Sequence, residues 1–298
     1  MSRHPNLRAA ASLPIELRRT TVPDQVRDWI RRVTGSAVVG ARRLPGASST
    51  AVHRVDLADG TRLVLRRYVW PGFLVAEPEA PQREADALRF ASSHELPVPT
   101  VIAADPTGAD VGDGIPVLLM SLLRGRAVAV PDLSRLAEAA ASIHAISADG
   151  LGHEYYCWYE AEMTTPPPTA TQRRMWDKAI ELWRSAMPAY QPTLVHRDFH
   201  PGNVLWSRGR ATGVVDWANA CRGPLGCDLA HCRNNLRTLA SPDVADEFIA
   251  TYTALTGAAF DPFWIIASHL EHDHAWWTPE RLALDEPDLA AAVAALTH

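Results

Sequence analysis

Apolar and polar residues alternate along residues 43–67, and this period of two predicts a β-ribbon. The dipeptide Asp59-Gly60 divides the ribbon and is a strong hairpin signal. Residues 23–33 have the pattern of a short helix, and the apolar run at residues 117–122 is typical of a strand. The pattern therefore predicts a β-rich N-terminal part of the chain.

The spacing of apolar residues becomes helical after Asp132. The residues that follow this spacing are Leu133, Leu136, Ala137, Ala140 and Ile143. His144 falls on the same apolar face, where a buried and hydrogen-bonded histidine is expected rather than a catalytic one. This helix is predicted to open a second, mainly helical part of the chain.

Two further β-prone runs, residues 203–206 and 211–217, flank a polar turn at residues 207–210 and predict a hairpin. With the turn centred between Gly209 and Arg210, Asn203 is expected opposite Asp216, with Cβ atoms about 5 Å apart. An amide oxygen and a carboxylate at that separation can share Mg²⁺, which favours oxygen ligands and keeps contacts to substrate phosphates.

Asp198 precedes Asn203 by five residues in a loop bounded by Pro201-Gly202. It is the expected acceptor of a hydrogen bond from a substrate hydroxyl, so the segment supplies what phosphoryl transfer needs. The alternative is a purely structural loop, in which Asp198 caps a turn and Asn203 satisfies backbone groups.

The segment His196-Arg197-Asp198-Phe199 with Asn203 follows the kinase catalytic-loop pattern, and Asp216-Trp217 stands where kinases carry Asp-Phe-Gly. With residues 223–230, it resembles the aminoglycoside phosphotransferase family, and the resemblance covers most of residues 36–275. It implies an α+β, bilobal protein-kinase-like fold with a β-rich N-lobe and a mainly helical C-lobe that carries a catalytic hairpin. The implied boundaries are 1–120 for the nucleotide-binding lobe, 121–125 for the hinge and 126–298 for the catalytic lobe.

The resemblance also implies roles for residues of the N-lobe. Arg66 falls where kinases place a phosphate-binding lysine, a substitution that keeps the charge but changes the hydrogen-bond geometry. Glu84 resembles the ion-pair partner of that basic residue. The alternative is that Glu84 is an acid on a solvated helix face. The turn with Ser48 and Ser49 takes the place of the glycine loop. Backbone groups from Met120 to Leu122 would bind the base of ATP or GTP.

In the C-lobe, the implied roles are catalysis by Asp198, Mg²⁺ binding by Asn203 and Asp216, and bracing of the loop by His196 and Arg197. His200 is expected near the transferred phosphate, with catalytic, phosphate-binding and structural roles open. Asp228 is expected to anchor the catalytic loop as a structural acid.

The run of residues 269–274 contains three histidines and two acids, which are side chains that can bind a metal ion. The favoured functional reading is a wall of the acceptor site, in which Glu271 or Asp273 meets ammonium groups beside aromatic rings. A solvated helix face is the plain alternative. A metal-dependent hydrolase would require a bound transition metal.

The amino-acid composition limits the classes of protein that the sequence can represent. Of 29 basic residues only Lys178 is a lysine, so no Walker A lysine exists and phosphate binding must use arginine and backbone amides. The formal charge of −5 argues weakly against nucleic acid. Four cysteines form no Cys-x-x-Cys pair, and neither a secretory signal nor a membrane span is apparent, so a cytoplasmic protein with reduced thiols is expected.

The predicted function is transfer of the γ-phosphate of ATP or GTP to a hydroxyl of a small molecule, such as an aminoglycoside or another antibiotic. A kinase of a choline-like alcohol, a sugar or homoserine is an alternative, because fold-level analogy cannot choose the acceptor. A non-catalytic nucleotide-binding protein is a second alternative, motivated by Arg66. The sequence does not predict an oligomeric state.

Overall fold

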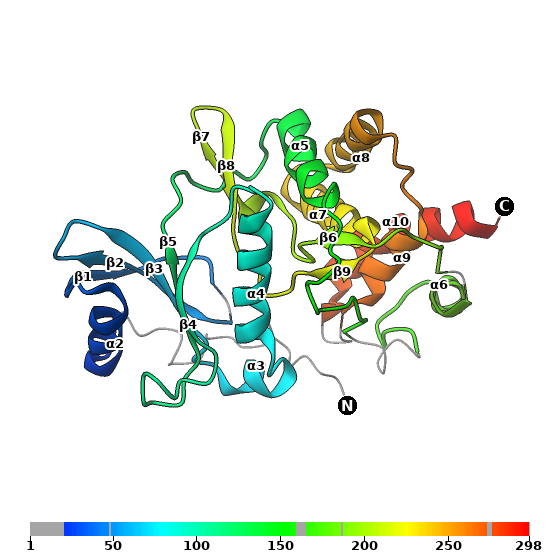
Figure 1. Ribbon diagram of the computed structural model, residues 1–298. Helices are drawn as coiled ribbons and strands as arrows, with labels where there is room; N and C mark the ends of the chain where they lie inside the picture. The colour runs from blue at the N-terminus through cyan, green and yellow to red at the C-terminus, as the bar shows by residue number, and fades with distance from the viewer. Residues whose placement is uncertain (1–20, 48, 159–164, 186, 273–275, 298) are drawn as a thin grey trace. The chain divides into compact units, whose positions relative to one another are not determined.

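The computed structural model describes residues 21–47, 49–158, 165–185, 187–272 and 276–297. The described chain divides into two compact units, whose elements are labelled in Figure 1. The N-terminal unit runs to Gly125 and includes Thr212–Asn219, and the C-terminal unit comprises Arg126–Ala211 and the chain from Ala220 onward.

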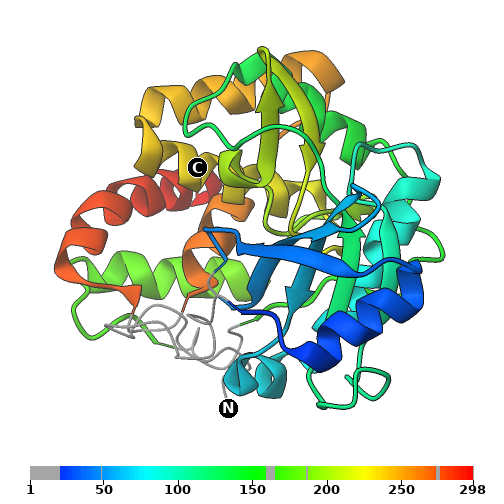
Figure 2. The ribbon, with the colours of Figure 1, turned by 90° about the vertical axis from the view of Figure 1, so that its left-hand side faces the viewer.

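The N-terminal unit is built on a five-stranded antiparallel sheet with the strand order β1-β2-β3-β5-β4. Figure 2 shows these strands side by side, with the first helix lying along the sheet. The strands are β1 (Val38–Arg43), β2 (Ala51–Leu57), β3 (Arg62–Arg67), β4 (Val101–Asp105) and β5 (Val117–Ser121). The helices are α2 (Asp24–Thr34), α3 (Pro71–Ala76) and α4 (Ala80–Ser93).

Helix α2 and one face of the sheet form a common core. Val26 and Ile30 of α2 pack in one cluster with Val55, Leu63 and Leu65 of the strands, and all five are buried. Val55 lies opposite Leu63 in the β2–β3 register, so the alternation in the sequence places both on the same face. Packing of these alternating residues holds β3 in place.

The predicted ribbon is confirmed for β2 and β3. At the turn between them Gly60 has a φ of 86°, and the backbone N–H of Thr61 donates to Asp59 Oδ1 at 2.8 Å. Strand β1 was not predicted, because its buried and exposed positions do not alternate regularly. The register with β2 shifts between Val38 and Gly40, which breaks the period of two.

The C-terminal unit is mainly helical. Its helices are α5 (Leu133–His144), α6 (Arg173–Ser185), α7 (Leu225–Leu239), α8 (Pro242–Thr256), α9 (Phe263–Leu270) and α10 (Pro279–Thr297). The short strands β6 (Thr193–Val195) and β9 (Cys221–Gly223) pair with each other, and η1 (Pro201–Asn203) is a single 3₁₀ turn. Helix α5 begins as predicted, because the side chain of Asp132 accepts from the backbone N–H of Arg135 at 3.1 Å.

The core between α6, α9 and α10 combines aliphatic side chains with two buried tryptophans. Trp176 of α6 is 1% exposed, and its ring centroid lies 4.9 Å from that of Trp277 in an edge-on arrangement. Ile266 and Leu270 of α9 and Leu289 of α10 belong to the same cluster. The core fixes α9, whose C-terminal end reaches the candidate site.

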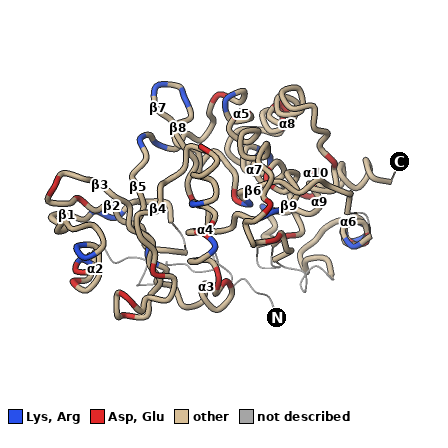
Figure 3. The backbone as a smooth tube through the Cα atoms, in the orientation of Figure 1, with Lys and Arg blue, Asp and Glu red and all other residues tan. Residues whose placement is uncertain are grey.

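The predicted hairpin is also present. It consists of β7 (Val204–Ser207) and β8 (Arg210–Val214), and its turn has left-handed φ values at Arg208 (50°) and Gly209 (72°). Figure 3 shows basic residues at its tip. Strand β7 begins one residue later than predicted, and β8 ends three residues earlier. Asn203 ends η1 and Asp216 follows β8, so neither belongs to the ladder in which they were expected to pair.

Among the described residues, none of the helices combines the length and apolar character needed to cross a membrane.

Candidate active site

The loop between β6 and η1 carries Asp198 and is anchored by a buried carboxylate. Asp228, in the first turn of α7, is 0% exposed. Its two oxygens accept the backbone N–H groups of His196 at 2.7 Å and Arg197 at 2.6 Å. As predicted, Asp228 holds the loop by its backbone.

His144 supports this anchor. Its Nε2 lies 3.2 Å from Asp228 Oδ2, and its Nδ1 lies 2.8 Å from the hydroxyl of Tyr252. Burial alone would raise the pKa of Asp228, but the hydrogen bond from His144 and the nearby imidazoles outweigh it and lower that pKa. His144 is therefore the buried structural histidine that its helical position predicted.

Arg197 has a φ of 61°, a left-handed backbone conformation that costs free energy in a non-glycine residue. Its guanidinium is enclosed, with 2% side-chain exposure. The guanidinium carbon lies 3.8 Å from the ring centroid of Trp158 and 4.5 Å from that of Tyr155, and Nη2 lies 3.3 Å from Glu271 Oε1. The strained backbone thus places a cation among aromatic rings and one carboxylate.

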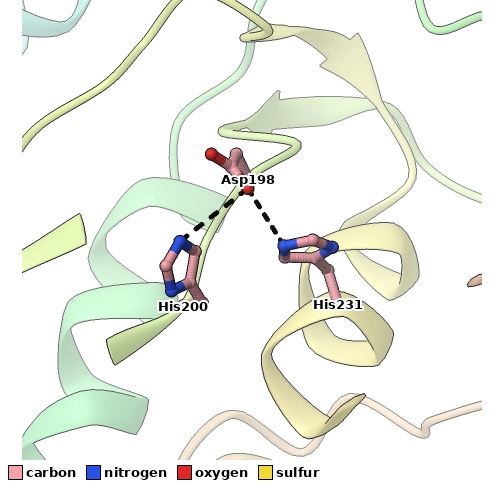
Figure 4. Close-up of side chains that lie close together, drawn as sticks. All are labelled: Asp198, His200 and His231. Carbon is pink, nitrogen blue, oxygen red and sulfur yellow. Dashed lines mark ion pairs between the residues drawn. The ribbon is translucent and has the colours of Figure 1, made fainter. Parts of the chain in front are cut away.

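Both carboxylate oxygens of Asp198 have partners. His231 Nε2 lies 3.0 Å from Oδ1, and His200 Nε2 lies 3.9 Å from the same oxygen (Figure 4). The side-chain amide of Asn203 donates to Oδ2 at 3.0 Å and to the backbone oxygen of Asp198 at 2.9 Å. The orientation of the carboxylate is therefore set from both sides.

The protonation state of Asp198 follows from these contacts. Burial disfavours the charged form, but the hydrogen bond from His231 and the imidazoles of His231, His200 and His196 outweigh it and lower the pKa to about 2. For His231, burial lowers the pKa, and its contact with Asp198 outweighs this and raises it. Asp198 is therefore ionised at neutral pH and accepts hydrogen bonds only.

The side-chain amide of Asn203 has a nitrogen that donates hydrogen bonds and an oxygen that can bind a cation. Its amide nitrogen donates twice to Asp198, so its amide oxygen is the group that suits a hard cation. The chemistry fits Mg²⁺, and the predicted role of Asn203 as a ligand stays a prediction.

The N-terminal unit contains a second charged group of residues. Arg66 Nη1 donates to both carboxylate oxygens of Glu84 at 2.9 Å and to Asp216 Oδ1 at 2.7 Å. The hydroxyl of Tyr68 also donates to Glu84. The predicted ion pair between Arg66 and Glu84 is therefore present.

The environment of Arg66 is buried, with 9% side-chain exposure for Arg66 and 1% for Glu84. Burial would lower the pKa of Arg66, but the carboxylates of Asp216 and Glu84 outweigh it and raise that pKa. Asp216 has a φ of 71° and 36% side-chain exposure, so its backbone is strained while its carboxylate is reachable.

Arg66→Ala is expected to lower the free energy of unfolding by about 3 to 5 kcal/mol, because it leaves the Glu84 carboxylate buried without its cation. Urea unfolding measures this loss. Arg62→Ala is the matched control on the same strand: the Arg62 side chain is 65% exposed and 3.6 Å from Asp56, so the expected loss is at most about 1 kcal/mol. Equal losses for the two variants would contradict the importance of the buried pair.

The other predicted nucleotide-binding residues lie at or after strand ends of the N-terminal unit. Ser49 is in the connection between β1 and β2, and Ser48 lies outside the described residues. Met120 is buried in β5 opposite Val64, and Leu122 follows that strand with 37% exposure. Their roles toward a nucleotide stay predictions.

The histidine-rich run does not form a metal cluster within the described residues. His269 is buried and lies 2.9 Å from Asp288, and His272 stacks on Trp276 with ring centroids 4.4 Å apart. Asp273 and His274 lie outside the described residues. In the part of the chain that the structure describes, the group with ligand atoms within 4.8 Å is instead Asp198, His200 and His231.

Glu271 was predicted to meet ammonium groups of an acceptor. Its carboxylate accepts a hydrogen bond from the hydroxyl of Tyr155 at 2.9 Å and forms the ion pair with Arg197. It lines a pocket whose walls include Tyr155, Trp158, Arg197, His231, Trp264 and Glu271. We call this the aromatic pocket.

Sequence reasoning missed His231, Tyr155 and Trp158. The spacing of His231 was informative, because it follows Asp228 by three residues and therefore lies on the same helix face as the loop anchor. Tyr155 and Trp158 lie outside helices and longer strands, where no periodicity marks a side chain as facing a pocket.

Comparisons with known proteins identify the family of the chain. The model of the phosphotransferase enzyme family (APH) matches residues 40–263. An N-acetylmuramate/N-acetylglucosamine kinase of Neisseria meningitidis is 33% identical over 72 residues, which are 24% of this chain and only 21% of that protein's length.

Solved structures show the same fold at low identity. A thermostable mutant of aminoglycoside phosphotransferase APH(4)-Ia, in a ternary complex with ADP and hygromycin B, has a TM-score of 0.62 and 17% identity, with 91% of this chain and 98% of that chain covered. The macrolide 2′-phosphotransferase MphH from Brachybacterium faecium has a TM-score of 0.58 and 20% identity, with the same coverage. The expected protein-kinase-like fold is confirmed.

The family match spans well over half of the residues and includes both the Asp198 loop and the segment with Arg66 and Glu84. The chain therefore belongs to the phosphotransferase enzyme family, whose members are small-molecule kinases.

Proposed function

We propose that this protein transfers the γ-phosphate of ATP or GTP to a hydroxyl group of a small molecule. The observation that carries the proposal is the setting of Asp198: an ionised carboxylate oriented by His231 and Asn203, on a loop anchored by Asp228. Phosphoryl transfer is catalysed mainly by positioning and charge stabilisation, and this loop supplies the positioning.

In the proposed reaction, Asp198 accepts a hydrogen bond from the acceptor hydroxyl, orients its oxygen and receives its proton as the phosphoryl group is transferred. A pKa of about 2 makes Asp198 a weak base, so orientation is the larger part of its contribution. His200, whose Nε2 lies 3.9 Å from Asp198 Oδ1, is the residue that we expect near the transferred phosphate.

Asn203 and Asp216 are the proposed Mg²⁺ ligands, and the metal would neutralise charge on the nucleotide phosphates. Arg66, held by Glu84, would add positive charge, together with backbone amides around Ser48 and Ser49. Backbone groups from Met120 to Leu122, where the proposed hinge at residues 121–125 begins, would bind the base.

The acceptor is proposed at the level of a class. Aminoglycosides and other hydroxylated antibiotics are one class, because related folds include an aminoglycoside and a macrolide phosphotransferase. Metabolites are the other, and a sugar is favoured among them because the partial relative is an amino-sugar kinase. A non-catalytic nucleotide-binding role is disfavoured by the ordered contacts of Asp198.

Release of nucleoside diphosphate from ATP and from GTP, with Mg²⁺ and a panel of aminoglycosides, macrolides, amino alcohols and sugars, tests the proposal. Turnover that requires one acceptor and stops when EDTA removes the metal is expected. Nucleotide binding without turnover for any acceptor would favour the non-catalytic alternative.

A further inference from the structure

The aromatic pocket adjoins the Asp198 carboxylate through one residue. His231 lines the pocket and its Nε2 lies 3.0 Å from Asp198 Oδ1. An acceptor bound in the pocket would therefore have a hydroxyl within reach of Asp198. The chemistry of the pocket walls then determines the class of acceptor.

The walls offer several ring systems. Tyr155 and Trp158 come from the segment after α5, Trp264 from α9, and His272 from the residues after α9. Tyr155 and Trp264 meet edge to face with centroids 6.1 Å apart, so packing fixes their orientation. Fixed aromatic rings suit a ligand with a flat or ring-shaped apolar face.

Arg197 and Glu271, two charged side chains among the described lining residues, pair with each other. Glu271 is the carboxylate among the described lining residues. It already accepts hydrogen bonds from Arg197 and Tyr155. Glu271 has 14% and Arg197 has 2% side-chain exposure, so the pair is largely closed to a ligand. A polycationic amine would find no uncommitted carboxylate among these residues, and losing its hydration there would cost free energy.

We propose that the acceptor is an uncharged, hydroxylated ring compound, such as a neutral sugar or glycoside, that stacks on the rings of the aromatic pocket. The proposal rests on the proposed function, since it names the substrate class of the same site. The C–H face of a sugar ring packs on aromatic side chains, while its hydroxyl groups provide the atom that accepts phosphate.

Matched pairs of probes test the charge. One pair is 2-amino-2-deoxyglucose and its N-acetyl derivative, and the other is kanamycin and its fully N-acetylated derivative; each pair keeps the hydroxyls and differs in ammonium charge. Calorimetry with the full chain measures binding, and diphosphate release measures turnover. The neutral member of a pair is expected to bind about ten-fold or more tightly than the charged member.

Two variants test the site. Trp158→Ala is expected to raise the Kd of the neutral probe about ten-fold and to leave nucleotide binding unchanged, with Trp183→Ala, outside the pocket lining, as the matched control. Ser268→Asp places a carboxylate in the lining and is expected to shift preference toward the amine. The result for Ser268→Asp is a change in ligand preference of the folded protein, so it does not depend on a loss of folding.

The outcomes separate the two proposals. Preference for the charged members, equal binding within the pairs, or no binding of any probe would overturn the acceptor class. Binding of the neutral probe without diphosphate release would support the class and count against the phosphotransferase reaction. Diphosphate release with a charged acceptor would support the reaction and overturn the class.

Discussion

Asp198→Asn is expected to lower kcat by about 10³-fold or more while the Kd of the nucleotide stays within about two-fold. The substitution keeps the size of the side chain but replaces one acceptor oxygen by an amide donor. That donor would face either His231 or the side-chain amide of Asn203. In the unmodified protein, carboxylate oxygens of Asp198 contact both groups as acceptors. The acceptor hydroxyl would lose both its orientation and its proton acceptor.

Steady-state kinetics with the best acceptor, together with calorimetry for the nucleotide, measure the two quantities. Asp177→Asn, which removes a charge from an exposed position of α6, is the matched control and is expected to keep full activity. An Asp198→Asn variant with a kcat near that of the unmodified protein would refute the role of Asp198.

The pH dependence of Asp198 follows from its lowered pKa. A carboxyl whose pKa is about 2 when folded, against about 3.9 in an unfolded chain, favours the folded state above pH 4 and loses this effect as the pH falls toward 2. Asp198 itself is therefore expected to cause no loss of activity between pH 5 and pH 9.

Local rules predicted the regular parts of the fold. The turn at Asp59-Gly60, the helix that follows Asp132 and the hairpin before Asp216 depend on neighbouring residues, and all three are present. Strand β1 was missed because its pairing with β2 shifts at Gly40, and a shift leaves no period in the sequence.

The candidate site was predictable only where a motif fixes the spacing. Arg66 and Glu84 were paired correctly on family resemblance, since 18 residues separate them in the chain and no local rule joins them. His231 and Trp158 approach the loop through tertiary packing of α7 and of an irregular segment. The engagement of Glu271 by Arg197 likewise depends on the left-handed backbone of Arg197, which its residue type disfavours.

Asp228→Asn is expected to lower the free energy of unfolding by about 3 kcal/mol and to reduce kcat as well. One oxygen would be replaced by an NH₂ group that faces a backbone N–H of His196 or Arg197, so a buried donor would lose its acceptor. We expect Arg197 to relax from its strained φ when this anchor is lost, and this relaxation would move Asp198 with the loop.

Urea unfolding at pH 7 and kcat measured on the folded fraction test both parts. The loss is expected at neutral pH. The pKa of Asp228 is lowered in the folded state, so its carboxylate stabilises the fold above the pKa of an unfolded chain and loses this contribution only in acid. Asp149→Asn is the control: its side chain is 79% exposed and 3.3 Å from Arg222, so an almost unchanged urea midpoint and an unchanged kcat are expected. If Asp228→Asn unfolded at the same urea concentration as Asp149→Asn, the loop would have to be held by contacts other than the carboxylate of Asp228, and the account of how Asp198 is positioned would fail with it.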